Sequence, residues 1–422
     1  MSRKTNLNDF CQNQLDKAAK LGNIDPDFVK ILSVPKHEII VNFPVKLQDG
    51  TIDIIKGYRI QHCNLLGPYK GGLRFHHDVH LDECKALAFW MTIKCSLLKL
   101  PLGGAKGGLK LNPYQYSEAD LKSISKGFSK ALHKYIGPNR DIPAPDMGTN
   151  SKIMDWMTAA YQEIRKSHEK ATYTGKSLMY SGSRGRSEAT GRGIMICVRE
   201  WFKRQGLQTN NATFIVQGFG NVGSNTAKLL STVLGMICQA VGDHTAYIVD
   251  TSGDGLNLRK ILEYTAEHRF LAGYETIDSN VKVIDKTEFF KLETDVVIPA
   301  AMEMQIGEEE AKNLNCKLIV EGANGPTDLD ADVIIRSRGI DLIPDVLANA
   351  GGVVVSYCEW LQNQKHESWD IDTVVEKLEV MMCQAFDEVY TQANSANIDK
   401  RMASYIIAIK NLEYVYQVQF KN

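Results

Sequence analysis

Three lysines stand in unusual sequence surroundings and could together form a reactive anion-binding site. Lys106 lies between two glycine pairs in residues 103–108, Lys70 lies in the glycine-rich residues 67–72, and Lys94 interrupts an apolar stretch. Glycine has no Cβ, so a ligand or a neighbouring backbone can approach closely. We interpret the glycines around Lys106 as room for ligands. If the three lysines converge, each lowers the pKa of the others because like charges disfavour protonation. Such a cluster predicts a lysine that is reactive at neutral pH.

A single aspartate stands on a segment that two prolines stiffen. Asp146 follows Pro143-Ala144-Pro145, and a helix is expected to begin after it at Thr149 or Asn150. A carboxylate fixed in this way is available for proton transfer. The alternative is that Asp146 only caps the helix, since aspartate is a favoured cap residue.

The second half of the chain contains a glycine motif between a predicted strand and a predicted helix. The apolar residues 214–216 are followed by Gly218-Phe219-Gly220-Asn221-Val222-Gly223, and Asp243 stands 20 residues after Gly223. These glycines suit a tight turn, close approach of a pyrophosphate and helix–strand packing, while the acid suits a ribose. The motif therefore predicts a dinucleotide site. Asp243 favours NAD, although NADP stays possible because the adjacent His244 could offset repulsion of a 2′-phosphate.

The elements that must position these residues follow from local patterns. A hairpin is expected from residues 38–45 and 52–60, with its turn at Asp49-Gly50. Helices are expected at residues 82–98 (capped by Asp82), 118–135, 150–165, 359–394 and 402–419. A Gly/Ser-rich connector at residues 175–193 suggests a hinge, and short apolar runs alternating with helices after it indicate a doubly wound parallel sheet.

We therefore expect an α/β protein in three parts. Residues 1–185 form an N-terminal domain, residues 186–355 a Rossmann-type dinucleotide domain, and residues 356–422 a C-terminal helical segment.

Composition excludes several classes of function. The 422 residues are 44% hydrophobic and 23% charged with a net charge of −1, which gives no sign of binding nucleic acid or an acidic membrane. Nine scattered cysteines without a CxxC pair favour reduced thiols, and the polar N-terminus carries no leader, so a cytoplasmic protein is expected. His62, His76, His77 and His80 are interpreted as a surface set, and no metal is expected.

Seven separated segments resemble one family. They are GPYKGGLRF at residues 67–75, LPLGGAKGG at 100–108, PAPDMGTNS at 143–151, EATGRG at 188–193, GFGNVG at 218–223, EGANGPT at 321–327 and DVLANAGGVVVSYCEW at 345–360. From about residue 34 to residue 419 the chain resembles glutamate dehydrogenases of the small-subunit type, within the glutamate/leucine/phenylalanine/valine dehydrogenase superfamily. One departure is Met304, where an asparagine is usual.

The resemblance implies a role for each matching residue. Lys106 is the catalytic lysine and Asp146 the acid/base; Lys94 binds the α-carboxylate, and Lys70 with Ser356 the distal one. Ala144 and Val353 pack on the substrate's carbon chain, while Thr190, Asn221, Asn324 and Asn349 surround the cofactor. The implied activity is reversible oxidative deamination of glutamate to 2-oxoglutarate and ammonium by a homohexamer with NAD(P). The resemblance also implies that residues 1–185 form the substrate-binding and oligomerisation domain and that residues 356–422 return to it across the cleft. The substrate is expected in the cleft between the first two domains.

Two alternatives stay open. Within the same class, the enzyme could act on an apolar amino acid, although Lys70 would then be left without a partner, which predicts strong rejection. From a different class, the chain could be a binding protein that has lost catalysis, against which Lys106 and Asp146 argue.

Overall fold

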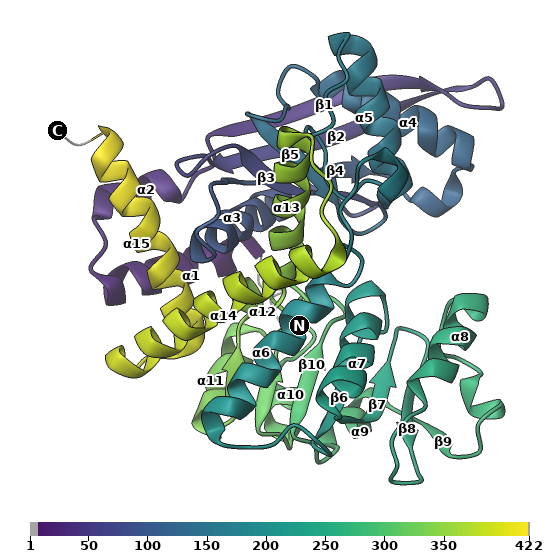
Figure 1. The fold of residues 1–422 in the computed structure, drawn as a ribbon, viewed down its shortest axis with the longest axis vertical. Helices are drawn as coiled ribbons and strands as arrows, with labels where there is room; N and C mark the ends of the chain where they lie inside the picture. The colour runs from purple at the N-terminus through teal and green to yellow at the C-terminus, as the bar shows by residue number, and fades with distance from the viewer. Residues whose placement is uncertain (1–6, 421–422) are drawn as a thin grey trace. The chain divides into compact units, whose positions relative to one another are not determined.

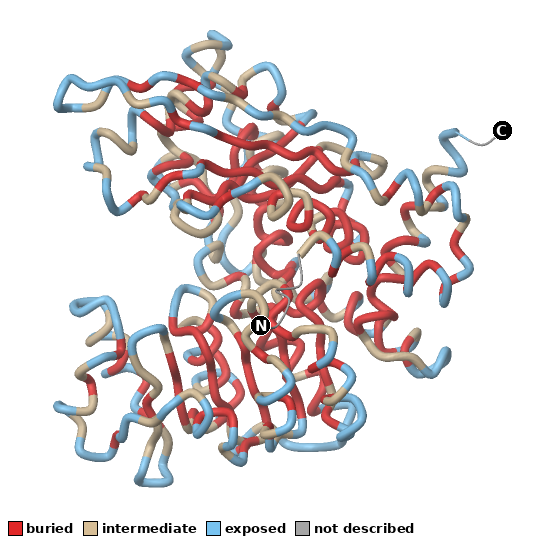
Figure 2. The backbone as a smooth tube through the Cα atoms, turned by 180° about the vertical axis from the view of Figure 1, so that it is seen from behind, coloured by how far each residue is buried: buried red, intermediate tan, exposed pale blue. Residues whose placement is uncertain are grey.

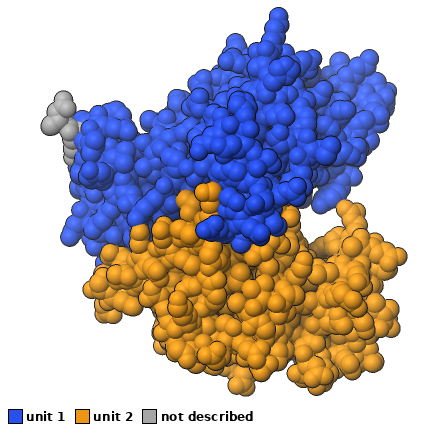
Figure 3. Space-filling model, viewed as in Figure 1, with its two compact units in different colours: residues 1–186, 353–376, 402–422 blue, residues 187–352, 377–401 orange. Residues whose placement is uncertain are grey.

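The computed structural model describes residues 7–420, which cluster into two compact units coloured separately in Figure 3. Unit 1 comprises Met1–Arg186, Val353–Glu376 and Met402–Asn422, and unit 2 comprises Ser187–Gly352 and Lys377–Arg401. The C-terminal stretch is thus divided more finely than the expected domain ranges, because residues 377–401 cluster with unit 2.

Unit 1 is built on a five-stranded mixed sheet with the order β1-β2-β4-β3-β5. Its strands are β1 (His37–Lys46), β2 (Ile52–Cys63), β3 (Tyr69–His76), β4 (Gly104–Lys110) and β5 (Asp141–Pro145). The predicted hairpin is confirmed: β1 and β2 pair antiparallel, and Gly50 in their turn adopts φ +88°. Strand β3 runs parallel to both β4 and β5, which places the Lys70 and Lys106 segments on neighbouring strands.

Helices cover both faces of this sheet (Figure 1). On one face, Cys84 and Ala88 of α3 (Leu81–Leu97) pack against Tyr58 and Ile60. On the other, α4 (Glu118–Leu132) and α5 (Ser151–Arg165) pack over residues such as Leu109. The remaining helices with residues in unit 1 are α1 (Leu7–Gly22), α2 (Pro26–Leu32), α13 (Gly351–Lys365), α14 (Ile371–Ala396) and α15 (Lys400–Phe420). Apart from β1 in this sheet and β8 and β9 in the second, the strands of both sheets are largely buried (Figure 2).

Two local expectations need correction. Asp82 does not cap α3, because the helix begins at Leu81 and His80 occupies the cap position. The predicted connector at residues 175–193 is also too long, since α6 (Ala189–Gln205) has already begun at its end.

Unit 2 is built on a seven-stranded sheet with the order β12-β11-β10-β6-β7-β8-β9. Its strands are β6 (Thr213–Gln217), β7 (Ile237–Gly242), β8 (Tyr247–Asp250), β9 (Val281–Ile284), β10 (Val296–Pro299), β11 (Leu318–Val320) and β12 (Asp341–Ile343). The neighbouring strands β12, β11, β10, β6 and β7 are parallel, as predicted, whereas β8 and β9 add an antiparallel edge. The helices between them are α7 (Asn221–Leu234), α8 (Leu258–His268), α9 (Lys286–Lys291), α10 (Glu308–Asn313) and α11 (Leu329–Ser337), and α12 (Asp345–Ala348) follows β12.

Within residues 7–420, no helix is both long enough and apolar enough to cross a bilayer.

Candidate active site and cofactor-binding loops

Strand register places several of the predicted substrate residues on one face of the unit 1 sheet. Lys106 on β4 pairs with Ile60 on β2, and Gly72 on β3 pairs with Ala144 on β5. Because side chains alternate along a strand, Lys70 lies on the same face as Gly72. Ile60 packs against α3, so this is the face that α3 covers. Lys94 belongs to α3 itself and is 6% exposed.

Lys106 and Asp146 form a direct contact. The Lys106 Nζ donates a hydrogen bond to Asp146 Oδ2, although the two residues are 40 positions apart. Asp146 is not a helix cap, because the Asn150 side chain accepts the hydrogen bond from Ile153 N and caps α5. The open question about Asp146 is thereby answered: its carboxylate faces a lysine.

The carboxyl of Asp146 is held in its ionised form. Its Oδ1 accepts hydrogen bonds from Arg74 Nε at 3.3 Å and from Met147 N at 2.6 Å. Burial alone would raise the pKa of Asp146, but Lys106 and Arg74 outweigh burial and hold it well below its ordinary value. Asp146 is therefore a carboxylate at neutral pH, and its proton affinity depends on how closely Lys106 and Arg74 contact it.

Lys70 is a buried cation with no bonded partner. It is 1% exposed, and within residues 7–420 its Nζ makes no hydrogen bond or ion pair. Burial, together with the positive charges of Arg186 and Arg59, lowers the pKa of Lys70 to about 7, and Glu359 offsets only part of this effect. We expected the other lysines to lower this pKa; burial and two arginines do so instead. A buried ammonium without a counterion is costly unless a ligand supplies one.

Arg186 is a functional candidate that sequence reasoning left without a role. Burial lowers its pKa, whereas the nearby Glu359 and Asp146 raise it, and its buried Nε has no hydrogen-bond partner among the described residues. Arg186 therefore adds a second under-paired cation close to Lys70. Its position in a Gly-Arg pair of the connector was the only signal in the sequence.

Helix α13 carries two of the predicted substrate residues and is anchored next to them. Val353 and Ser356 are 9% and 2% exposed. One turn after Ser356, the fully buried Glu359 accepts hydrogen bonds from Gly175 N at 2.8 Å and from Lys176 Nζ at 2.7 Å. This anchorage fixes the start of the connector to α13.

The glycines around Lys106 do not leave room for ligands, contrary to our interpretation. A Cβ on Gly103 would lie 2.1 Å from Cys63 O, and one on Gly108 would lie 2.1 Å from Arg74 O. The space is filled by the protein's own backbone, so these glycines bring strands and loops together. Gly72 has a further effect: its missing Cβ leaves space for Asp146, whose Oδ2 would lie 2.9 Å from it.

The nucleotide motif of unit 2 separates into glycines that the fold needs and one that it does not. Gly218 has φ +94°, and a Cβ on Gly223 would lie 1.8 Å from Gly218 O. A Cβ on Gly220, by contrast, would meet nothing within 4 Å. Helix α7 begins at the next residue, Asn221, with no side chain capping it. Open space at the positive end of a helix suits a pyrophosphate, so these residues fit a dinucleotide.

The other predicted cofactor residues lie at the carboxyl edge of the same sheet. Asp243 follows β7, and its carboxylate accepts hydrogen bonds from Thr245 N at 2.7 Å and Leu271 N at 2.9 Å. It therefore also shapes its own loop. Asn349 donates to Asn324 Oδ1 at 3.1 Å, which brings these two together. Thr190 lies in the first turn of α6.

We expected all four histidines to lie at the surface, and for His62 this expectation is wrong. His62 is 4% exposed and its Nδ1 lies 2.8 Å from Thr92 Oγ1, and burial lowers its pKa to about 4. His76, His77 and Asp78 have potential ligand atoms within 4.8 Å of one another.

Comparisons with known proteins agree with this geometry. The model of the Glutamate/Leucine/Phenylalanine/Valine dehydrogenase family matches residues 181–419, and its dimerisation-domain model matches residues 35–163. The chain belongs to this dehydrogenase family. It is 41% identical over 408 residues to a glutamate dehydrogenase of Thermotoga maritima, covering 97% of each chain. It is 40% identical to an NAD-specific glutamate dehydrogenase of Peptoniphilus asaccharolyticus, covering 95% of this chain and 94% of the relative.

A solved member of the family has the same fold. The hetero-hexameric glutamate dehydrogenase of Thermus thermophilus, in its Leu-bound form, superposes with a TM-score of 0.94 at 29% identity, covering 100% of this chain and 99% of that one. Against the family pattern, Met304 adopts φ +53°, a conformation that suits the usual asparagine better than methionine.

Proposed function

We propose that this protein is an NAD-dependent glutamate dehydrogenase that interconverts L-glutamate with 2-oxoglutarate and ammonium. The observation that carries the choice of substrate is the buried, unpartnered Lys70. An amino acid with a distal carboxylate supplies the missing counterion, and the hydroxyl of Ser356 adds a donor. An apolar amino acid would leave the ammonium buried and unpaired, which costs far more than a lost methylene contact.

The remaining substrate contacts follow from the same face of unit 1. We assign the α-carboxylate to Lys94 and the carbon chain to Ala144 and Val353. Arg186 adds positive charge near Lys70, which favours a substrate with two carboxylates over one with a single carboxylate. The substrate is thus fixed at both ends before any bond changes.

Proton transfer is assigned to the Lys106–Asp146 pair. Asp146 is ionised and accepts a proton from the substrate ammonium, leaving a neutral amine whose lone pair can form the C=N bond. Asp146 releases this proton to solvent and then takes a proton from the water that adds to the C=N bond, while the Lys106 ammonium donates to the water oxygen as it loses that proton. Asp146 passes the proton to the nitrogen, and the C–N bond breaks as the C=O bond forms. The remaining hydroxyl proton leaves with the ammonia as ammonium, so the pair ends as it began.

The cofactor is NAD. When bound, it accepts the hydride that leaves the substrate Cα. Gly220 and the N-terminus of α7 would hold the pyrophosphate, Asp243 the ribose, and Thr190, Asn324 and Asn349 the nicotinamide end. Two observations favour NAD over NADP: a carboxylate at Asp243 repels a 2′-phosphate, and the Peptoniphilus relative is named NAD-specific.

The deciding assay is absorbance of the reduced nicotinamide. Purified protein is mixed with 2-oxoglutarate, ammonium and NADH, and in parallel with NADPH and with the 2-oxo acids of leucine and phenylalanine. We expect rapid oxidation of NADH with 2-oxoglutarate alone. Oxidation with the apolar 2-oxo acids instead would overturn the substrate assignment, and no oxidation with any of them would favour a binding protein.

We further propose a homohexamer. The Thermus relative is a hetero-hexamer, and a single gene product would form the symmetric equivalent. Light scattering after size exclusion should give six times the 47.1 kDa chain mass. A monomer or dimer mass at micromolar concentration would contradict the assignment.

A further inference from the structure

Two segments with proposed cofactor residues, called the cofactor loops below, leave adjacent parallel strands of unit 2. Residues 321–324 follow β11, and residues 345–349, which comprise the short helix α12 and Asn349, follow β12; these strands pair in register. Asn349 Nδ2 donates to Asn324 Oδ1 at 3.1 Å and to Gly322 O at 3.2 Å. The two asparagines therefore hold each other, and any shift of one loop moves both.

Two buried carboxylates tie the backbones of these loops together. Glu321 is fully buried and accepts a hydrogen bond from Asp345 N at 2.9 Å. Asp345 is 1% exposed and accepts from Gly325 N at 3.0 Å and from Val346 N at 2.8 Å. The first residue of each loop is thus an acid whose side chain accepts a hydrogen bond from the backbone of, or just after, the other loop.

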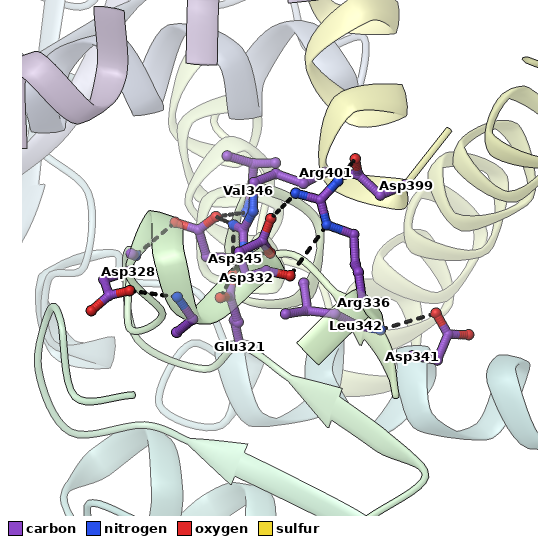
Figure 4. A network of polar contacts seen from close by, with 12 residues as sticks. Glu321, Asp328, Asp332, Arg336, Asp341, Leu342, Asp345, Val346, Asp399 and Arg401 are labelled. Carbon is purple, nitrogen blue, oxygen red and sulfur yellow. Dashed lines mark hydrogen bonds and ion pairs between the residues drawn. The ribbon is translucent and has the colours of Figure 1, made fainter. Parts of the chain in front are cut away.

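Two neighbouring acids in a dry interior need a counterion. Burial and Asp345 raise the pKa of Glu321, whereas Arg401 lowers it. Arg401 is 3% exposed; its Nη1 and Nη2 donate to the two oxygens of Glu321 at 2.9 and 2.8 Å, and its Nη1 lies 3.5 Å from Asp345 Oδ1. Figure 4 shows this guanidinium among the acids, with Asp332 as a third at 3.4 Å. A planar, two-pronged donor can hold both oxygens of Glu321 at once.

Arg401 comes from a distant part of the chain. It stands 80 residues after Glu321, in the first turn of α15, and is the last residue of unit 2 before the chain continues in unit 1. The two cofactor loops are therefore held together by Arg401, the residue after which the chain leaves unit 2.

We infer that Arg401 is a positioning residue for the cofactor: through Glu321 and Asp345 it holds Asn324 and Asn349 where the nicotinamide end of NAD binds. Arg401 itself touches neither substrate nor cofactor. The inference rests on the proposed function for the identity of the cofactor, and it deepens it by naming what sets the shape of the site.

The test is NAD binding, measured by titration calorimetry in the absence of glutamate, on Arg401→Met and Arg401→Lys. Arg336→Met is the matched control, because Arg336 also bonds Asp332, at 2.6 Å, but contacts neither Glu321 nor Asp345. We expect the NAD dissociation constant to rise at least tenfold in Arg401→Met and several-fold in Arg401→Lys. Lysine keeps the positive charge but cannot donate to both oxygens of Glu321 in the planar geometry of a guanidinium. Arg336→Met should stay within twofold of the unmodified protein.

A second variant separates positioning from simple loss of stability. In Arg401→Met with Glu321→Gln, the glutamine needs no counterion, so part of the lost NAD affinity should return. KM for NAD should rise in Arg401→Met while KM for glutamate stays within twofold.

Three results would overturn the inference: NAD affinity within twofold in a folded Arg401→Met, an equal loss in Arg336→Met, or an equal rise of both KM values. Should Arg401→Met not fold, Arg401→Lys decides by the same criteria. If the unmodified protein binds NAD but does not turn over glutamate, the proposed function fails while the Arg401 result still stands.

Discussion

Replacing Lys70 by methionine should stabilise the protein while destroying its preference for glutamate. Burial and the nearby Arg186 and Arg59 lower the pKa of Lys70 from 10.5 to about 7, so the folded protein holds this lysine charged only at a cost. At 1.36 kcal/mol per pKa unit, the cost is about 5 kcal/mol below pH 7. Methionine fills a similar volume without charge, so the free energy of unfolding at pH 6 should rise by up to about 5 kcal/mol.

The sign of the pH dependence identifies the cause. Between pH 7 and 10.5, the unfolded chain binds the Lys70 proton and the folded chain does not, so the stability of the unmodified protein rises with pH in this window. The advantage of Lys70→Met should therefore shrink by about 3 kcal/mol from pH 7 to pH 9. Urea unfolding at fixed protein concentration at pH 6, 7 and 9 measures this difference in the free energy of unfolding. Lys110→Met, at an exposed lysine, is the control, and its free energy of unfolding should change little at any pH.

The same substitution removes the counterion for the distal carboxylate. KM for glutamate should rise roughly 30- to 1000-fold, corresponding to about 2–4 kcal/mol for a truncated buried charge pair. In the unmodified protein, glutamate binding above pH 7 must take up a proton at Lys70, so KM should rise about tenfold per pH unit there. A less stable Lys70→Met at pH 6, together with an unchanged KM for glutamate, would refute the reasoning.

Three further predictions concern other parts of the structure. Asp146→Asn should lower kcat by about 10²- to 10⁴-fold with NAD affinity unchanged, since it removes the proton acceptor and the counterion of Lys106 but no proposed cofactor contact; a kcat within tenfold would show that another group moves the proton. Gly220→Ala should leave the thermal midpoint unchanged and weaken NAD binding, whereas Gly223→Ala should destabilise the fold because its Cβ would lie 1.8 Å from a carbonyl oxygen; equal midpoints for both would contradict this division. Met304→Asn should raise the free energy of unfolding by about 1 kcal/mol by relieving a left-handed methionine, and an unchanged urea midpoint would argue against strain there.

Local patterns in the sequence were sufficient for most of the secondary structure. The hairpin turn at Gly50, the helix cap at Asn150 and the strand before Gly218 each depend on residues within a few positions of one another. Residue type also identified Lys106 and Asp146 as reactive candidates, because a charged residue flanked by glycine pairs or prolines is unusual. The predicted cap of α3 was wrong: by residue type Asp82 is the better cap, but the helix begins one residue earlier, at Leu81, and His80 holds the cap position without a side-chain hydrogen bond.

Tertiary structure decided what those residues experience. The contact between Lys106 and Asp146 spans 40 residues and depends on strand register and on the missing side chain of Gly72. The cost of keeping Lys70 charged depends on its burial and on Arg59 and Arg186 nearby, none of which the sequence around Lys70 indicates.

The glycines beside Lys106 illustrate the same division. Their type was evident from the sequence, but whether they face a ligand or the protein's own backbone is a matter of packing between distant strands and loops. A sequence states which groups are present, whereas pKa values, ion pairs and close approach depend on distances between groups that only the folded chain brings together.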